Sequence, residues 1–182
     1  ATQGASVGLK LALNVGAMLI AFLALLALAK WCFSFAGEVV EWAVNLVSGE
    51  GSVEFEWKLE TAMGYLFAPL AWVMGIEGSE CPKAGELLSY KLIANEFIAY
   101  DLLADVQANP DTALSDRTSM ILTYALCGFA NFGSIGIQIA GIGGLAKHRR
   151  GDLARLSLLA MLGGTLAAFM TACFAGMLYG DP

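Results

Sequence analysis

A run of 19 uncharged residues, from Leu11 to Ala29, constrains the fold of this chain more than any other feature. Asn14 is its one polar side chain, and Lys10 and Lys30 stand at its two ends. As a helix rising about 1.5 Å per residue, the run is ~29 Å long, which matches the hydrocarbon core of a bilayer. We therefore predict a transmembrane helix over residues 9–34, with both lysines reaching to the membrane interface.

The composition extends this interpretation to the rest of the chain. Of the 182 residues, 58% are hydrophobic and 14% are charged, whereas soluble domains have about 45–50% and about 25%. One soluble domain of this size cannot bury so much apolar surface. The net charge of −6 and the lack of a long basic stripe exclude a nucleic-acid partner. The four cysteines lack metal-binding spacing, so we expect small apolar side chains and no metal site or disulfide.

Residues 35–76 are predicted to form external or interfacial helices. The apolar stretch from Thr61 to Ile76 is only 16 residues long and contains Pro69. It is therefore short for a membrane-spanning helix, and partial insertion fits its length better.

Residues 80–108 are predicted to form a re-entrant hairpin. The apolar segment 87–100 includes Lys91, Asn95 and Glu96. It is too short to cross a bilayer as a helix, and charged residues flank it on both sides, so both ends are expected on one side. A surface amphipathic helix is the alternative. On one helix Lys91 and Asn95 share a face that Glu96 adjoins, which makes a polar cluster narrower than a solvated face.

Residues 117–146 are predicted to form a broken transmembrane helix. The run from Ser119 to Ala146 has 28 residues, no charge and six glycines. Glycine-rich, polar-interrupted helices at membrane depth can expose backbone groups to a transport site, but small residues also serve close helix packing. Asn131 and Ser134 are three residues apart and share a helix face, which favours a site. A further transmembrane helix is predicted over residues 153–179.

The charge distribution predicts the orientation of these helices. The loop 147–155 has four Lys/Arg residues and one acid, whereas 14 acids lie between Glu38 and Asp116. Short loops rich in Lys and Arg face the cytoplasm. We therefore expect a multi-pass protein of the plasma membrane (the inner membrane of a bacterium), with the loop 147–155 cytoplasmic and the hairpin and C-terminus external.

Two segments resemble the signatures of a known family. The first is KLIANEFIAY at residues 91–100, and the second is ALCGFANFGSIGIQ at residues 125–138. Both are similar to the C-terminal half of the concentrative nucleoside transporters, as is NVGAMLIAF at residues 14–22. Ser89 stands where the family pattern has Gly, and Ile98 replaces its usual Val, but the polar positions match.

The resemblance implies an all-α integral membrane fold that is one half of an inverted-repeat transporter. Its parts are transmembrane helices, a re-entrant helical hairpin and a broken helix, and the resemblance implies a homotrimer in the lipid bilayer. The family's first hairpin carries a Gly-Gln-Thr-Glu motif that helps to bind the coupling cation, and this sequence has no such motif. The chain is thus expected to pair with an N-terminal half. That half would hold most ligands of the Na⁺ or H⁺, and no covalent cofactor is expected.

The resemblance also implies a substrate site for a nucleoside. Glu96 would lie at the hairpin tip, and Asn131 and Ser134 at the helix break, where they would bind the ribose hydroxyls. Phe129 would lie nearby, and Asn95 beside Glu96 completes the candidate set. The chemistry agrees, because a carboxylate at membrane depth is costly unless paired, and sugar hydroxyls donate to it.

Three other functions compete with a cation-coupled nucleoside symporter. The first is transport of another small polar solute by the same architecture. The second is a structural membrane subunit, whose polar residues act only as helix–helix contacts. An enzyme is the least supported, because the one histidine, His148, lies in a basic loop and no nucleophile–base pair is visible, so no catalytic residue is assigned.

Overall fold

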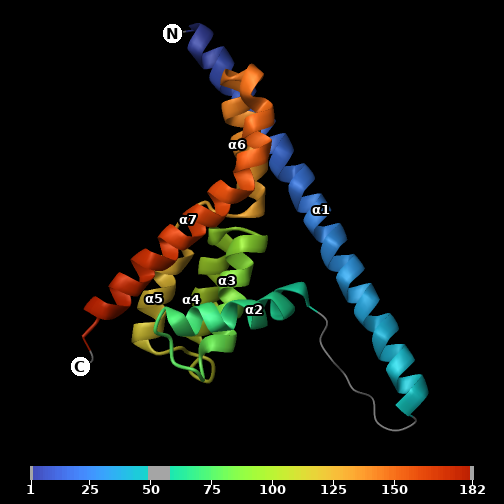
Figure 1. Cartoon of the computed structure of the whole chain (residues 1–182), viewed down its shortest axis with the longest axis vertical. Helices are drawn as coiled ribbons and strands as arrows, with labels where there is room; N and C mark the ends of the chain where they lie inside the picture. Colours follow the sequence, from blue (N-terminus) through green and yellow to red (C-terminus); the bar gives the residue numbers. More distant parts are fainter. Residues whose placement is uncertain (1, 49–57, 181–182) are drawn as a thin grey trace.

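The computed structural model describes residues 2–48 and 58–180, and these ranges contain helices and no strand (Figure 1). The helices are α1 (Thr2–Ser48), α2 (Leu59–Val73), α3 (Cys81–Ile93), α4 (Glu96–Ala108), α5 (Asp116–Leu126), α6 (Phe132–Leu145), the 3₁₀ turn η1 (Lys147–Arg149) and α7 (Arg150–Leu178).

The first helix is longer than the sequence analysis predicts. We expected it to end at residue 34, with interfacial helices from residue 35, but α1 continues to Ser48. No proline interrupts residues 30–48, and the isolated Gly37 costs a helix only about 1 kcal/mol. The predicted interfacial segment thus has one described helix of its own, α2, while residues 49–57 lie outside the described ranges.

Within residues 2–48 and 58–180, two helical stretches are long and apolar enough to cross a membrane. They are Gly4–Leu46 in α1 and Lys147–Leu178, which is η1 with α7. Two shorter apolar helices accompany them, Thr61–Val73 and Phe132–Leu145. Large apolar side chains such as Trp42 are exposed along α1, as expected for a surface in contact with lipid or further protein.

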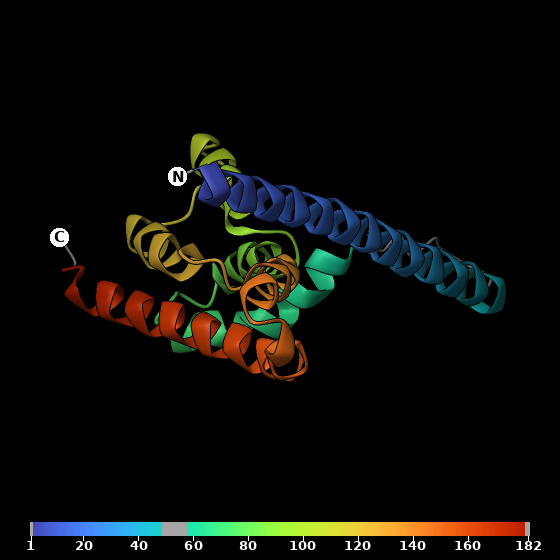
Figure 2. The same ribbon diagram turned by 90° about the horizontal axis from the view of Figure 1, so that it is seen from above.

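The core of the molecule is the helical hairpin α3–α4 with α2 and α5 packed against it and α7 packed on α5, while α1 runs along one side (Figure 2). Leu87 and Leu88 of α3 and Ile121 and Leu122 of α5 are almost completely buried there. The α1 helix packs on α6, which rises from the core toward the N-terminus (Figure 1). The chain thus places the hairpin and the α5–α6 segment side by side.

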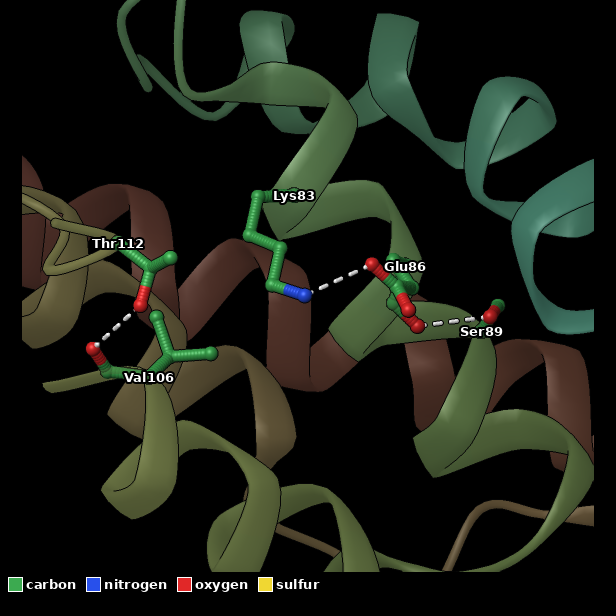
Figure 3. A network of polar contacts seen from close by, with 5 residues as sticks. All are labelled: Lys83, Glu86, Ser89, Val106 and Thr112. Carbon is green, nitrogen blue, oxygen red and sulfur yellow. Dashed lines mark hydrogen bonds and ion pairs between the residues drawn. The ribbon is translucent and has the colours of Figure 1, made fainter. Parts of the chain in front are cut away.

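Polar contacts hold the open end of this hairpin. On α3, the ammonium of Lys83 pairs with Glu86 at 3.0 Å, and the Ser89 hydroxyl donates to the Glu86 carbonyl at 2.7 Å (Figure 3). After α4, the Thr112 hydroxyl donates to the Val106 carbonyl at 3.3 Å. Each of these bonds is local to one arm, so each stabilises its own arm without joining the two.

Glu80 joins the start of the hairpin to the start of α5. Its carboxylate accepts bonds from the Ser115 amide at 2.6 Å, the Ser115 hydroxyl at 2.9 Å and the Thr118 hydroxyl. Desolvation by burial alone would raise the pKa of Glu80, but the bonds from Thr118 and Ser115 outweigh it, so the pKa is lowered. The charged carboxylate therefore holds Ser115, the N-cap residue of α5, at neutral pH.

Arg117 of α5 bonds to the backbone of two other segments of the chain. Its guanidinium donates to the Gly75 carbonyl after α2 and to the Gly176 carbonyl of α7, the latter at 3.3 Å. Gly75 has a φ of +93°, which glycine adopts without strain. One side chain of α5 thus binds the backbone just after α2 and the backbone of α7.

The closest helix contact, between α2 and α3, predicts a sharp mutational effect. A Cβ atom added at Gly85 would lie 2.2 Å from the Gly64 carbonyl oxygen and 2.8 Å from the Ala68 nitrogen. Backbone atoms cannot rotate away, so we expect Gly85→Ala to cost at least about 1–3 kcal/mol of stability. Thermal melting of the detergent-solubilised full transporter measures this loss.

Gly78→Ala is the matched control for this substitution. A Cβ atom at Gly78 has no neighbour within 4 Å. The Gly78→Ala variant should therefore melt at the same temperature as the unmodified protein. Equal melting of the Gly85 and Gly78 variants would contradict the close packing of α2 on α3.

Candidate functional site

The hairpin turns between α3 and α4 through two residues, Ala94 and Asn95. The Asn95 backbone is extended, and its side-chain oxygen accepts from the Ile98 amide at 3.0 Å, which makes Asn95 the N-cap of α4. Lys91 belongs to α3 and Glu96 begins α4. The polar cluster therefore forms across a turn, and the single-helix face considered in the sequence analysis is corrected: an asparagine cap starts a new helix here.

The second interruption separates α5 from α6 at residues 127–131. Gly128 has a φ of +118°, a conformation that other residues rarely adopt. Asn131 then caps α6 reciprocally with Ser134. The Ser134 amide donates to the Asn131 side-chain oxygen at 2.8 Å, and the Asn131 amide donates to the Ser134 hydroxyl at 3.2 Å. Glycine followed by this capping box fixes where α6 begins.

These two helix starts meet at Glu96. The Asn131 side-chain amide donates to one carboxylate oxygen of Glu96, Oε2, at 3.3 Å. Both residues are buried, with Glu96 only 5% exposed, and Ser134 is buried beside Asn131. The carboxylate lies in the first turn of α4 and bonds to the cap of α6, where helix dipoles favour a negative charge.

The other carboxylate oxygen of Glu96, Oε1, is buried and accepts no hydrogen bond from the described residues. An unpartnered buried acceptor is costly, so native proteins rarely keep one without a reason. A hydroxyl donor from a bound solute would satisfy it. The structure thus brings three of the predicted site residues together, namely Glu96, Asn131 and Ser134.

The other two predicted residues lie at the edge of this cluster. The Phe129 ring is 67% exposed and contacts the Phe97 ring edge-to-face, with centroids 6.2 Å apart. Asn95 is half-buried, and its side-chain oxygen is used by the cap, which leaves its NH₂ group for other contacts. Phe129 and Phe97 give the cluster an apolar, aromatic border.

Lys91 belongs to this neighbourhood, although the candidate set omits it. Its ammonium donates to the Ala125 carbonyl in the last turn of α5 at 2.7 Å, and lies 5.6 Å from the centre of the Phe169 ring of α7. The side chain is 1% exposed and attracts Glu96 electrostatically. In the sequence, Lys91 is a lone lysine in an apolar run, five residues before the lone glutamate Glu96. This isolation is the feature that points to a buried ammonium near the carboxylate.

Known proteins are similar to this chain in both sequence and fold. A family model described as the C-terminus of Na⁺-dependent nucleoside transporters matches residues 1–176. An uncharacterized transporter of Haemophilus influenzae is 45% identical over 180 residues, covering 97% of this chain and 40% of the relative. Solute carrier family 28 member 3 of Eptatretus stoutii is 38% identical over 190 residues, covering 98% of this chain and 26% of that protein.

A solved structure is similar over almost the whole chain. A doubly substituted variant of CNTnw in an outward-facing state superposes with a TM-score of 0.82 at 38% identity. The match covers 98% of this chain and 41% of that one. The all-helical transporter fold predicted from the sequence is therefore confirmed, and the chain spans less than half the length of these relatives.

Proposed function

This chain belongs to the concentrative nucleoside transporter family, and on that basis we propose that it forms the ribose-binding half of a cation-coupled nucleoside symporter. The observation that carries the proposal is the buried Glu96–Asn131 pair, with one carboxylate oxygen left without a described partner. Glu96 accepts hydroxyl hydrogens of the ribose, while Asn131 and Ser134 lie beside it. Phe129 and the NH₂ group of Asn95 border the sugar.

The rest of the proposal concerns the whole transporter. Most ligands of the coupling cation belong to the N-terminal half, and Na⁺ is the first candidate because the matching family is described as Na⁺-dependent. The hairpin enters the membrane from outside, the assembly is a homotrimer in the plasma membrane, and no step involves catalysis.

Uptake by the full-length protein in liposomes tests this function. Labelled uridine and adenosine are supplied while Na⁺ and pH gradients are imposed separately. We expect accumulation driven by one of the two gradients and abolished by its collapse. Failure of both nucleosides to accumulate under either gradient, in liposomes that contain folded protein, would rule out nucleoside symport.

A structural role for the same residues has one observation in its favour. The Asn131–Glu96 hydrogen bond itself joins the hairpin to α6, as a helix–helix contact would. Transport of another polar solute would use the same free oxygen. Substrates that lack single hydroxyls separate these alternatives, as described in the Discussion.

The orientation of the chain gives a separate prediction. Both Ser79, before the hairpin, and Gly151, at the start of α7, are exposed. We expect Ser79→Cys to react with an impermeant thiol reagent from outside the cell, and Gly151→Cys only from inside. The background lacks the four native cysteines. Labelling of both positions from one side would overturn the proposed topology.

A further inference from the structure

A groove of about 330 Å³ lies between the N-terminal part of α1 and the junction of α6 with α7, and none of Glu96, Asn131 and Ser134 lines it. Figure 1 shows the N-terminal part of α1 beside α6. Three cationic side chains line it, Lys10, Lys147 and Arg150, together with the amide of Asn14. No carboxylate is among its lining residues. The acid of this junction, Asp152, pairs with Arg149. The groove therefore has a net positive potential suited to an anion.

One of the three cations is held in place by the backbone. The Nε–H of Arg150 donates to the Gly143 carbonyl near the end of α6 at 3.0 Å. Within residues 2–48 and 58–180, the terminal guanidinium nitrogens and the ammonium groups of Lys10 and Lys147 have no ion-pair partner. An oriented guanidinium that lines the same groove as two ammonium groups is an arrangement that binds phosphate oxygens well.

The remaining walls of the groove are apolar. Val7 and Leu11 of α1 face Leu145 of α6 across it, and Leu145 is largely exposed. On the α6 side the groove is lined by Gly141 and Gly144, whose lack of side chains makes it deeper. A Cβ atom at Gly144 would have no neighbour within 4 Å. A free phosphate has no use for such walls, whereas the glycerol and acyl carbons of a lipid bury themselves against them.

The position along the helices matches the headgroup layer of a membrane. Lys147 begins one stretch that can span a bilayer, and Lys10 lies near the start of the other. Basic residues at such helix ends reach toward lipid phosphates, and basic pockets between membrane helices bind anionic headgroups. We propose that this groove is a binding site for one anionic phospholipid, with its phosphate between Lys10, Lys147 and Arg150 and its carbons along α1 and α6.

Native mass spectrometry of the full transporter, with phosphatidylglycerol or phosphatidylcholine added, tests the proposal. We expect one tightly retained phosphatidylglycerol and no comparable phosphatidylcholine. The double variant Lys10→Gln/Lys147→Gln should bind phosphatidylglycerol roughly ten- to thirtyfold more weakly. The matched control, Arg149→Gln/Arg155→Gln, removes two positive charges from the same junction but from outside the groove, and should retain the lipid.

A second variant separates the groove's shape from its charge. Gly144→Leu changes no charge and fills the floor, so it should reduce lipid retention to a similar degree. Equal lipid binding by the lysine pair and the arginine pair would overturn the site, as would unchanged binding by Gly144→Leu. Saturable binding of inorganic phosphate that needs both lysines and survives Gly144→Leu would assign the groove to a free anion instead.

Discussion

Replacing Glu96 by glutamine in the full-length transporter is expected to weaken nucleoside affinity roughly ten- to hundredfold. The substitution keeps the size of the side chain but exchanges a charged acceptor for a neutral amide. Hydrogen bonds to charged groups contribute about 1.5–3 kcal/mol, which gives this range. Competition binding or uptake with uridine measures it, and the buried Oε1 atom is the acceptor that the substitution weakens.

The dependence on substrate hydroxyls makes this prediction specific. The loss should shrink for a deoxynucleoside that lacks the hydroxyl bound by Glu96, because that bond is already absent. Glu86→Gln is the control: Glu86 lies on the other arm of the hairpin and pairs with Lys83 at the surface, so affinity should not change. If Glu96→Gln weakens uridine and its deoxy analogues equally and also lowers the melting temperature, Glu96 is a helix contact and no ribose ligand.

Asn131→Ala and Ser134→Ala should show the same dependence on sugar hydroxyls and little dependence on the base. Each substitution also removes part of the cap of α6, which costs about 0.5–2 kcal/mol of stability. This loss of stability must be subtracted from the measured effect. Ser115→Ala removes the cap of α5 instead. It should lower stability without any selectivity among nucleosides.

Replacing Lys91 by methionine is the second change with a large expected effect. Methionine has a similar length but cannot donate to the buried Ala125 carbonyl, and Glu96 loses its neighbouring positive charge. We expect a loss of about 1.5–3 kcal/mol in stability from the bond alone. Uptake should fall further than folding accounts for, because the end of α5 that precedes the helix break is no longer held.

Lys83→Met provides a matched comparison on the same helix. Lys83 also lies on α3, but its side chain is 41% exposed and its ammonium pairs with the partly exposed Glu86. Exposed ion pairs contribute about 0–1 kcal/mol, so this variant should melt and transport nearly as the unmodified protein does. Similar losses in the Lys91 and Lys83 variants would show that the buried ammonium has no special role.

Much of this site could be predicted from sequence, because its residues stand out against an apolar background. Glu96 and Asn131 are polar side chains in runs that otherwise suit a membrane, and the glycines around Asn131 favour an interrupted helix. The resemblance to known transporter motifs then grouped them. The bond between Glu96 and Asn131 joins residues 35 positions apart, and no helical periodicity predicts it.

Other features needed the three-dimensional structure. The capping roles of Asn95 and Asn131 depend on where each helix starts, which a spacing of three or four residues does not determine. The acceptor of Lys91 is a backbone carbonyl, which leaves no trace in the sequence. The helix predicted over residues 9–34 continues to Ser48 in the structure, because charged residues such as Glu38 and Glu41 do not interrupt a helix.

The reciprocal cap of Asn131 and Ser134 has a consequence for turnover. The Ser134 hydroxyl already donates to the Asn131 carbonyl at 2.6 Å, and the Asn131 side-chain oxygen already accepts from the Ser134 amide. A sugar hydroxyl that approaches these groups therefore shares an oxygen that already accepts one hydrogen bond, through its second lone pair. The Oε1 atom of Glu96 is the acceptor that gains a bond outright. In the symporter proposed above, a site with one acceptor of this kind would favour quick release of the nucleoside in each transport cycle.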